Sequence, residues 1–351
     1  MITVLVFYLG TVSAQRSHSF PFVTGDGFRA IADYVCEADD CFGGNVRPFF
    51  RTFSSLGRPA IFFVKTDFIG SFPVDLDFPH VLITHNSDYG ITAGGLSYLA
   101  NENLLAWYVQ NPLIRHPKLV AIPLGIMNQN LPFGLEYTLL EEKRTSNVAP
   151  SELLMINFSI HTNPPIRGHA VEVLRAKGFD YMVPKDKNYS THLDDTLRFK
   201  FNACPPGNGW DTYRLWETMY LGRYPVVLQR DSFDDLLSGL PVLQVRSFAD
   251  VDKDMLERFY RDAPSMGFSD EKLSMSYWAS RILYHAKRGH LPALGPQPRT
   301  ASAGPASCPS QDLDEGEPVV AAEAPVSSAE LFDCVAANDA AHSCSRSLAS
   351  P

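Results

Sequence analysis

Short apolar runs bounded by polar or turn-forming residues recur along the first half of the chain. They occupy residues 60–64, 81–83 and 119–122. Runs of this length suit parallel strands that are buried on both faces of a sheet. Between the last two runs, the apolar side chains of residues 103–110 could form one buried helical face, so we expect a helix there. Strand, helix and strand in this order predict a βαβ unit.

The same alternation resumes in the second half, after a charged and then polar segment at 141–150 that we expect to be a linker. Segments that end in Gly178 or Gly222 are typical of helices. The expected strands are 153–156, 201–204, 225–228 and 241–245, and the expected helices are 167–177, 194–199, 211–221, 252–261 and 274–288. The pattern therefore predicts an α/β fold with two Rossmann-type domains, 25–140 and 151–290, that face a cleft.

The two ends of the chain depart from this pattern. Residues 1–24 hold either a signal peptide, which here lacks a basic start, or a first buried strand over residues 2–9. No other stretch is long and apolar enough for a membrane span, so any membrane association is expected through this segment alone. Residues 291–351 are rich in Ala, Ser, Pro and acidic residues. We expect them to form a disordered tail, because they cannot bury enough apolar surface to fold.

Composition and charge narrow the class of protein. The chain has 351 residues, of which 45% are hydrophobic, so it can build two domains with buried cores. The formal net charge is −9, and most of it comes from residues 291–351, where eight acidic residues face two basic ones. The chain lacks the basic footprint of a nucleic-acid-binding protein, so nucleic acid is not expected as the main partner.

The spacing of cysteines and aspartates indicates whether the protein binds a metal and in which cellular compartment it folds. None of the six cysteines forms a C-x-x-C pair, which argues against a zinc site. Cys36 and Cys41 could form a disulfide in a secretory lumen, although two free thiols are the favoured interpretation. Cys204 is expected to be a packed core thiol. The D-x-D sequence at Asp75 and Asp77 is flanked by prolines, so an exposed turn is favoured there and no metal is expected.

The most informative stretch is residues 200–245. A short apolar strand enters a Pro-Pro turn, Gly207-Asn208-Gly209 follows as a loop, and a helix is expected to begin near Asp211. We call residues 205–209 the glycine loop, because its glycines leave the backbone uncovered. The first amides of a helix lack partners within it, and the helix dipole favours negative charge there. A phosphate or pyrophosphate is therefore the expected occupant.

Three polar residues of this helix are spaced three apart. Asp211, Arg214 and Glu217 would form one stripe along its first two turns. The planar guanidinium of Arg214 suits phosphate, because it donates two parallel hydrogen bonds. The carboxylate of Glu217 suits a ribose diol, because it accepts from both hydroxyls. An ordinary salt bridge between Arg214 and Glu217 is the plainer alternative.

The order of these residues resembles the donor-site signature of exostosin-like glycosyltransferases. The matching residues are Pro205-Pro206-Gly207-Asn208-Gly209, Asp211, Arg214-x-Trp216-Glu217 and Tyr220-Leu221-Gly222-x-x-Pro225-Val226-Val227. Segments 81–89, 110–124 and 157–167 resemble algal and viral members of the family, so the resemblance covers residues 78 to 288. Tyr213, Arg223 and Tyr224 depart from the family pattern and leave the donor open.

The resemblance implies a GT-B fold and a donor site built from these residues. Arg167 and Arg214 would contact the donor diphosphate. The glycine loop would let its backbone approach the phosphates, Asp211 would open the helix, and Glu217 would hold the ribose. In a GT-B enzyme arginines and helix amides stabilise the charge on the leaving diphosphate, so no metal or other cofactor is needed. The nucleotide-diphosphate sugar is then the donor substrate.

An inverting transferase also needs a group that accepts the proton of the acceptor. His85 and Asp88 follow the strand at 81–83, and ligands of open α/β sheets bind at that end of the strands. Asp88 is the first candidate for the catalytic base and His85 the second. The residues around them are turn formers, so a purely structural turn is the alternative. Asn157 and Ser159 could line the same cleft.

Together these expectations define a glycosyltransferase, either a hexosyl- or a pentosyltransferase. It would move a sugar from a nucleotide-diphosphate donor to a carbohydrate or glycoprotein acceptor, with inversion and without a metal. Two alternatives remain on the same fold: a non-catalytic protein that binds carbohydrate or nucleotide sugar, and a hydrolase. We expect the secretory pathway, in the Golgi or the lumen of the endoplasmic reticulum, while a cytoplasmic location stays open.

Overall fold

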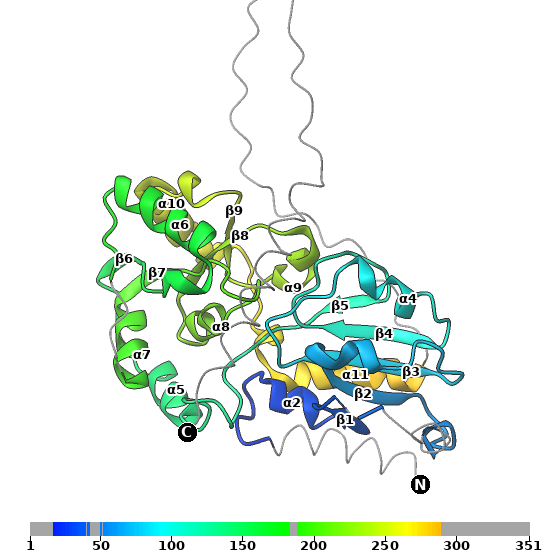
Figure 1. Ribbon diagram of the computed structural model, residues 1–351. Helices are drawn as coiled ribbons and strands as arrows, with labels where there is room; N and C mark the ends of the chain where they lie inside the picture. Colours follow the sequence, from blue (N-terminus) through cyan, green and yellow to red (C-terminus); the bar gives the residue numbers. More distant parts are fainter. Residues whose placement is uncertain (1–16, 40, 43–49, 51, 183–187, 289–351) are drawn as a thin grey trace, which may run out of the picture. The chain divides into compact units, whose positions relative to one another are not determined.

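The computed structural model describes residues 17–39, 41–42, 50, 52–182 and 188–288, and it contains two parallel β-sheets (Figure 1). The first sheet has five strands in the order β1-β2-β3-β4-β5, and the second has four in the order β6-β7-β8-β9. Each strand pairs in parallel with the next one along the chain. Two parallel sheets confirm the prediction of an α/β fold and are compatible with Rossmann-like domains.

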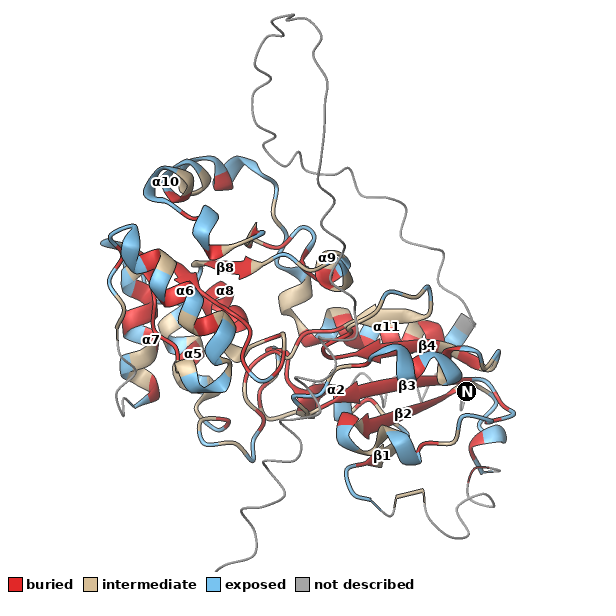
Figure 2. Cartoon of the chain, turned by 45° about the horizontal axis from the view of Figure 1, so that its top comes forward, coloured by how far each residue is buried: buried red, intermediate tan, exposed pale blue. Residues whose placement is uncertain are grey.

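The first sheet is buried on both faces. Its strands are Tyr34–Cys36 (β1), Ala60–Lys65 (β2), His80–His85 (β3), Leu104–Val109 (β4) and Leu119–Ala121 (β5). Phe62 and Leu82 belong to one hydrophobic core, whereas Phe63 and Ile83 belong to another. This division follows from the alternation of side chains along a strand. Figure 2 shows β2, β3 and β4 as almost continuously buried segments.

The second sheet and the helices complete the described part of the chain. The strands are Glu152–Met155 (β6), Phe199–Ala203 (β7), Tyr224–Leu228 (β8) and Leu243–Val245 (β9). The helices are Gly25–Arg29 (α2), Leu96–Leu99 (α4), Tyr137–Arg144 (α5), Pro164–Ala176 (α6), Tyr189–Arg198 (α7), Tyr213–Tyr220 (α8), Asp234–Leu237 (α9), Lys253–Asp262 (α10) and Met275–Arg288 (α11). All strands predicted from apolar runs in the described part of the chain are confirmed, with ends shifted by a few residues.

The last helix returns to the first sheet. Although α11 follows the second sheet in sequence, it packs against α2, β3 and β4 (Figure 1). Trp278 of α11 lies beside Phe28 of α2, with ring centroids 6.4 Å apart. The hydroxyl of Tyr108 on β4 lies 2.6 Å from Nδ1 of His285 on α11. The two sheets therefore do not divide the chain into two consecutive segments.

The helix predicted at residues 103–110 is wrong, because this segment is strand β4. It pairs with β3 on one side and β5 on the other. Six residues are too few for a typical helix, and the aromatic pair Trp107 and Tyr108 favours a strand. Both rings are fully buried, on opposite faces of the sheet. The apolar residues that suggested one helical face in fact fill two cores.

Three segments outside the sheets bear on the predicted boundaries. The first four residues of the expected linker, 141–144, form the end of helix α5, and the rest leads into β6. The signal-or-strand alternative at residues 1–14 and the tail at 291–351 lie outside the described residues. Within the described part of the chain, no helix is both long and apolar enough to cross a membrane.

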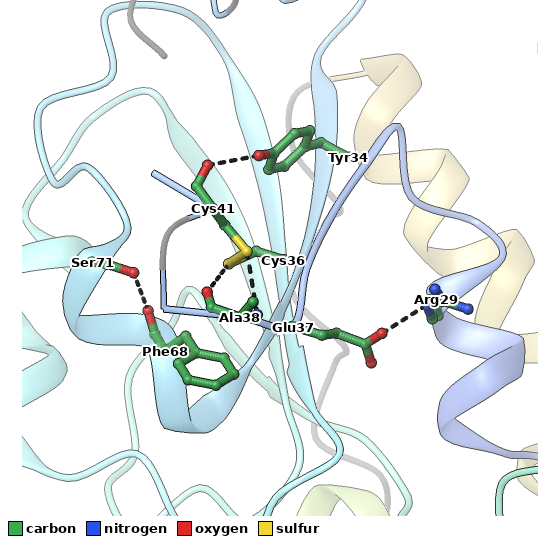
Figure 3. The surroundings of a disulfide bond; sticks show 8 residues. All are labelled: Arg29, Tyr34, Cys36, Glu37, Ala38, Cys41, Phe68 and Ser71. Carbon is green, nitrogen blue, oxygen red and sulfur yellow. Dashed lines mark hydrogen bonds and ion pairs between the residues drawn. A yellow bond between two sulfur atoms is a disulfide. The ribbon is translucent and has the colours of Figure 1, made fainter. Parts of the chain in front are cut away.

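Cys36 and Cys41 are joined by a disulfide, so the favoured interpretation of two free thiols is wrong (Figure 3). β1 ends at Cys36, and the chain then turns back, which brings the two Cα atoms to 5.4 Å. That separation lies in the range that a disulfide requires. The hydroxyl of Tyr34 on β1 also donates to the carbonyl of Cys41 at 2.7 Å. The five-residue spacing in the sequence is compatible with this turn but does not require it.

The return of α11 predicts a large effect of one core substitution. Trp278 is 2% exposed, and its Nε1 donates to the carbonyl of Lys272 at 2.9 Å. Trp278→Ala should lower the free energy of unfolding by about 3–5 kcal/mol, because it leaves a cavity between α11 and α2. Urea denaturation measures this change. Leu135→Ala, at a side chain that is 61% exposed, is the control and should change stability by less than about 0.5 kcal/mol.

Candidate functional site

The glycine loop joins β7 to the segment before α8 in a compact turn. The amide of Gly207 donates to the carbonyl of Gly209 at 2.9 Å. A Cβ atom at Gly207 would lie 2.8 Å from Nη2 of Arg167, and one at Gly209 would lie 2.7 Å from Nδ2 of Asn111. Neither position has room for a side chain. The glycines are therefore required by close packing on both sides of the loop, and not only by the approach of a ligand.

Arg167 supports the glycine loop from within the protein. Nε donates to the carbonyl of Pro206 at 2.9 Å, Nη1 to that of Ser159 at 2.8 Å and Nη2 to that of Pro205 at 3.4 Å. The side chain is buried, and this burial lowers the pKa of the guanidinium to about 10. Three of its five N–H groups thus hold backbone carbonyls. Arg167 therefore supports the loop, and the contact with a diphosphate that the resemblance implies stays a prediction.

Arg214 carries the clearest sign of a missing partner. It lies in the first turn of α8, and its Nη1 atom is buried without a hydrogen-bond partner among the described residues. Burial lowers the pKa of Arg214, and the charge of Arg214 in turn helps to lower the pKa of Arg167. A buried donor with no acceptor costs about 1–3 kcal/mol, and more on a charged group. An anion placed against these two guanidinium groups would remove that cost.

Glu217 is held by two neighbours rather than by Arg214. Oε1 accepts from the hydroxyl of Tyr189 at 3.0 Å, and Oε2 lies 3.4 Å from Nε2 of His192. The side chain is only 4% exposed, yet the pKa of Glu217 is lowered, because the contacts with His192, Tyr189 and Arg214 outweigh the cost of burial. The ordinary salt bridge between Arg214 and Glu217, the alternative to ligand binding, is not among the ion pairs of the described residues. A carboxylate has about four acceptor positions, so Glu217 keeps capacity for a further donor.

Asp211 faces the first half of the protein and does not share a stripe with Arg214 and Glu217. α8 begins at Tyr213, so Asp211 precedes the helix. Its Oδ2 accepts from the amide of Leu124, just after β5, at 2.7 Å. Both of its oxygens accept from Nε1 of Trp216, at 2.9 and 2.8 Å. The expected three-residue stripe therefore does not include Asp211, because the amides of Thr212 and Leu124 both donate to its carboxylate.

The start of α8 is not capped by a side chain. Thr212 occupies the N-cap position without a side-chain hydrogen bond to the helix, and its own amide donates to Oδ1 of Asp211 at 2.7 Å. The first amides of a helix have no acceptors within it. The amide of Leu215 donates to the carbonyl of Thr212 at 3.1 Å, so the amides of Tyr213 and Arg214 are the ones left for water or a ligand. The uncapped end of α8 therefore agrees with the anion site that the sequence predicts.

The loop after β3 lies against the glycine loop. Nδ2 of Asn208 donates to Oδ2 of Asp88 at 3.2 Å. The carbonyl of Asp88 would be 3.4 Å from a Cβ atom at Gly209. Asp88 is exposed, so its second carboxylate oxygen can be reached from solvent. The structure thus brings the first candidate base beside the predicted donor site.

His85, the second candidate base, is buried and engaged on both sides of its ring. Nδ1 lies 2.9 Å from Oδ1 of Asn86, and Nε2 lies 3.0 Å from the carbonyl of Pro123. The residue is 1% exposed, and burial lowers the pKa of its imidazole. Its two nitrogens have no free side toward a substrate. The geometry suits a structural role for His85 at the end of β3.

Sequence reasoning missed several residues at this edge of the first sheet. Asn86 directly follows β3 and Asn111 comes two residues after the end of β4, and both adopt left-handed backbone, with φ of 61° and 58°. Oδ1 of Asn111 accepts from the amide of Asp211 at 2.8 Å. Asp26, in the first turn of α2, accepts from the amide of Gln129 at 2.8 Å. The available signal was an Asn within two residues of the end of an apolar strand. Apart from Gly, Asn is one of the residue types that best tolerate left-handed backbone.

The structure shows where the residues considered for metal binding and the free cysteine lie. Among the described residues, no group of three or more His, Cys, Asp and Glu side chains could hold a metal ion. Asp75 and Asp77 are exposed, as expected of a turn. Cys204 is a buried free cysteine, and burial raises the pKa of its thiol to about 12. A thiol with such a pKa is a core residue at neutral pH, which agrees with the prediction.

A hollow of about 720 Å³ lies at the other end of α8. It is lined by Pro21, Arg144, residues 146–149, residues 219–223, Asp270 and residues 273–274. None of the predicted site residues lines it. Arg223 at its wall donates to the carbonyls of Val148 and Leu197. No lining side chain has a buried polar atom without a partner. We therefore keep the candidate site at the glycine loop, where such an atom is present on Arg214.

No protein-family model matches the chain, and no curated protein is significantly similar to it. The assignment of function therefore depends on the residues themselves and on their geometry.

The burial of Asp211 predicts a specific pH dependence. Burial raises the pKa of its carboxyl from an ordinary 3.8 to about 6, although the N–H groups that donate to it act in the opposite direction. Between these two values the folded state holds a proton that the unfolded state has released. The free energy of unfolding should therefore fall as pH rises from about 4 to about 6, and this contribution should be level above that range.

The comparison of Asp211 with Asp211→Asn isolates this effect, because asparagine does not titrate. Urea denaturation of both proteins at several pH values gives the difference in their free energies of unfolding. Between about pH 4 and pH 6, the protein with Asp211 should lose about 3 kcal/mol of unfolding free energy relative to Asp211→Asn. A difference that stays constant over this range would show that Asp211 titrates normally.

Proposed function

We propose that this protein is a GT-B-type glycosyltransferase of the exostosin-like kind, and that the glycine loop with the start of α8 binds the diphosphate of a nucleotide sugar. The observation that carries the proposal is the buried and unpartnered Nη1 of Arg214. It belongs to a guanidinium beside Arg167 at an uncapped helix start. Two neighbouring cations and free amides are complementary to a group with two negative phosphates.

The proposal gives the two arginines different roles. Arg167 donates to two carbonyls of the glycine loop and would add its positive charge to the site without touching the phosphates. Arg214 would donate to the phosphates directly, because its Nη1 still needs an acceptor. As the bond between sugar and phosphate breaks, charge grows on the leaving diphosphate. Fixed cations and amides stabilise that charge without any change in their own positions.

Glu217 would hold the ribose of the donor. Its carboxylate already accepts from Tyr189 and faces His192, so its position and orientation are fixed. A ribose hydroxyl would use one of its remaining acceptor positions. Because Glu217 lies one turn after Arg214 on α8, ribose and diphosphate would follow the helix in order. We propose this role on the resemblance and on the fixed geometry of the carboxylate.

Asp88 would accept the proton of the acceptor hydroxyl. It is exposed and lies against Asn208, which brings a carboxylate to the donor site from the first half of the protein. Attack from that side, opposite the leaving diphosphate, would invert the anomeric carbon. Asp88 is preferred over His85, because His85 is buried with both ring nitrogens engaged. The acceptor would be a carbohydrate or the glycan of a glycoprotein.

The disulfide between Cys36 and Cys41 supports a place in the secretory pathway. Disulfides persist in oxidising compartments and are rare in the cytosol. The lumen of the Golgi or of the endoplasmic reticulum also supplies the nucleotide sugars and glycans that such an enzyme would use. We propose this location for the protein.

Substitution of Arg214 tests the nucleotide site. Arg214→Met should weaken the binding of UDP or GDP by about 10- to 100-fold, because it removes a charged donor to phosphate. It should leave the unfolding midpoint unchanged or higher, because a buried donor without a partner is replaced by an apolar side chain. Isothermal titration calorimetry and urea denaturation measure the two effects.

Arg175→Ala is the matched control for charge. Arg175 lies on α6 with Arg167 but is exposed, so its loss should leave nucleotide binding within about twofold of the parent. Equal losses in both variants would mean that nucleotides respond only to net charge. The assignment of the site to Arg214 would then be wrong.

A panel of UDP- and GDP-sugars, with and without oligosaccharide acceptors, tests the reaction. Release of UDP or GDP that depends on an acceptor, together with a new glycosidic product, is the result expected of a transferase. Release of free sugar without an acceptor would indicate a hydrolase. Tight binding of nucleotide sugar with no turnover would indicate a binding protein, and no binding at all would refute the proposed function.

A further inference from the structure

Glu37 lies inside the ring that the disulfide closes at the end of β1 (Figure 3). Its Oε2 accepts from Nε of Arg29, on α2, at 3.0 Å. The two sulfur atoms tie Cys41 to Cys36, so the segment that carries Glu37 cannot extend away from β1. Figure 3 shows the carboxylate of Glu37 directed away from the disulfide and toward Arg29. A charged side chain is thus held on a short covalent ring at the edge of the sheet.

The same carboxylate reaches the end of β3. Oε1 of Glu37 accepts from Nδ2 of Asn86 at 3.0 Å. Oδ1 of Asn86 in turn accepts from Nδ2 of Asn128 at 2.8 Å, and Oδ1 of Asn128 accepts from the amide of Asp26 at 3.0 Å. A Cβ atom at Gly25 would lie 1.8 Å from Oδ1 of Asn86, so Asn86 packs directly against the backbone at the start of α2. The ends of β1 and β3 and the start of α2 are connected through Asn86.

Asn86 needs this support because of its backbone. Its φ of 61° is the left-handed conformation, which costs a residue with a Cβ about 1–2 kcal/mol. Such a conformation persists when surrounding contacts fix it. Both the amide and the oxygen of the Asn86 side chain are engaged, by Glu37 and by Asn128. The direction in which the chain leaves β3 toward Asp88 therefore depends on a side chain that Glu37 holds.

We propose that Glu37 is a positioning residue for residues 86–89, and that the Cys36–Cys41 disulfide holds it in place for that role. The proposal rests on the proposed function only in so far as Asp88 is the catalytic base. Loss of Glu37 frees the amide of Asn86, residues 86–89 relax toward ordinary backbone, and Asp88 leaves its place beside Asn208. Reduction of the disulfide has the same effect through Glu37. The reaction thereby becomes sensitive to thiol reductants although no cysteine touches a substrate.

Hydrogen exchange followed by mass spectrometry tests the positioning without reference to activity. In full-length Glu37→Ala, peptides that cover residues 84–90 should exchange about fivefold faster, the effect of one lost hydrogen bond. Peptides that cover 157–167 and 205–215 should stay within about twofold of the parent. Asp39→Ala is the matched control. Asp39 lies in the same ring, is exposed and makes no hydrogen bond or ion pair with the described residues.

The double variant Cys36→Ser/Cys41→Ser should speed exchange in the same peptides. Unchanged exchange at residues 84–90 in Glu37→Ala would overturn the proposal. Equal acceleration in all peptides would also overturn it, because that pattern indicates global destabilisation. If Glu37→Ala has the expected effect but the double cysteine variant has none, the role of the disulfide is refuted.

Turnover separates this proposal from the proposed function. With a donor sugar that the panel identifies, Glu37→Ala should lower kcat about tenfold and leave the Kd of UDP or GDP within about twofold. A change in nucleotide affinity of the same size as the change in kcat would contradict a role confined to Asp88. If the parent protein neither binds nucleotides nor turns over any donor, the proposed function fails. The exchange experiment then still decides whether Glu37 positions residues 86–89.

Discussion

A buried guanidinium has to find oxygen atoms, and this requirement organises the candidate site. Arg167 meets it with three backbone carbonyls, two of which belong to the glycine loop. The loop can approach Arg167 only because Gly207 has no side chain. Arg214, on α8, has no comparable set of acceptors among the described residues, and its Nη1 is buried there without a partner. One arginine therefore builds the site, and the other leaves it incomplete until an anion binds.

Several of the contacts between the two halves of the protein lie close to the same loop. Asp211 accepts from the amide of Leu124, and its own amide donates to Asn111. Asn208 donates to Asp88, which lies three residues after the end of β3. A change in the distance between the two halves would therefore alter hydrogen bonds at the glycine loop and just before α8. Under the proposed function, the donor would lie against the second sheet and the acceptor against the first.

The polar residues at the end of β3 become more exposed along the chain. His85 is enclosed at the end of β3, Asn86 is held by side chains from two other elements, and Asp88 is exposed. Only the last of these can exchange a proton with a substrate in the structure described. If Asp88 is the base, as we propose, the polar residues around it contribute through geometry and not through their own chemistry.

Local sequence determined much of this protein. Apolar runs predicted seven of the nine strands in the described part of the chain. β1 contains no clear apolar run, and the apolar segment of β4 was assigned to a helix. The glycine loop, the helix after it and the cationic residue Arg214 were also evident, because each depends on neighbours within a few residues. Tertiary structure alone decided that Asp211 turns to Leu124, 87 residues away, and that Arg167 lies under a loop 38 and 39 residues away. It also decided that α11 returns to the first sheet and that Cys36 pairs with Cys41. A side chain with several possible acceptors chooses among them by what the fold brings near, and spacing along the chain does not contain that information.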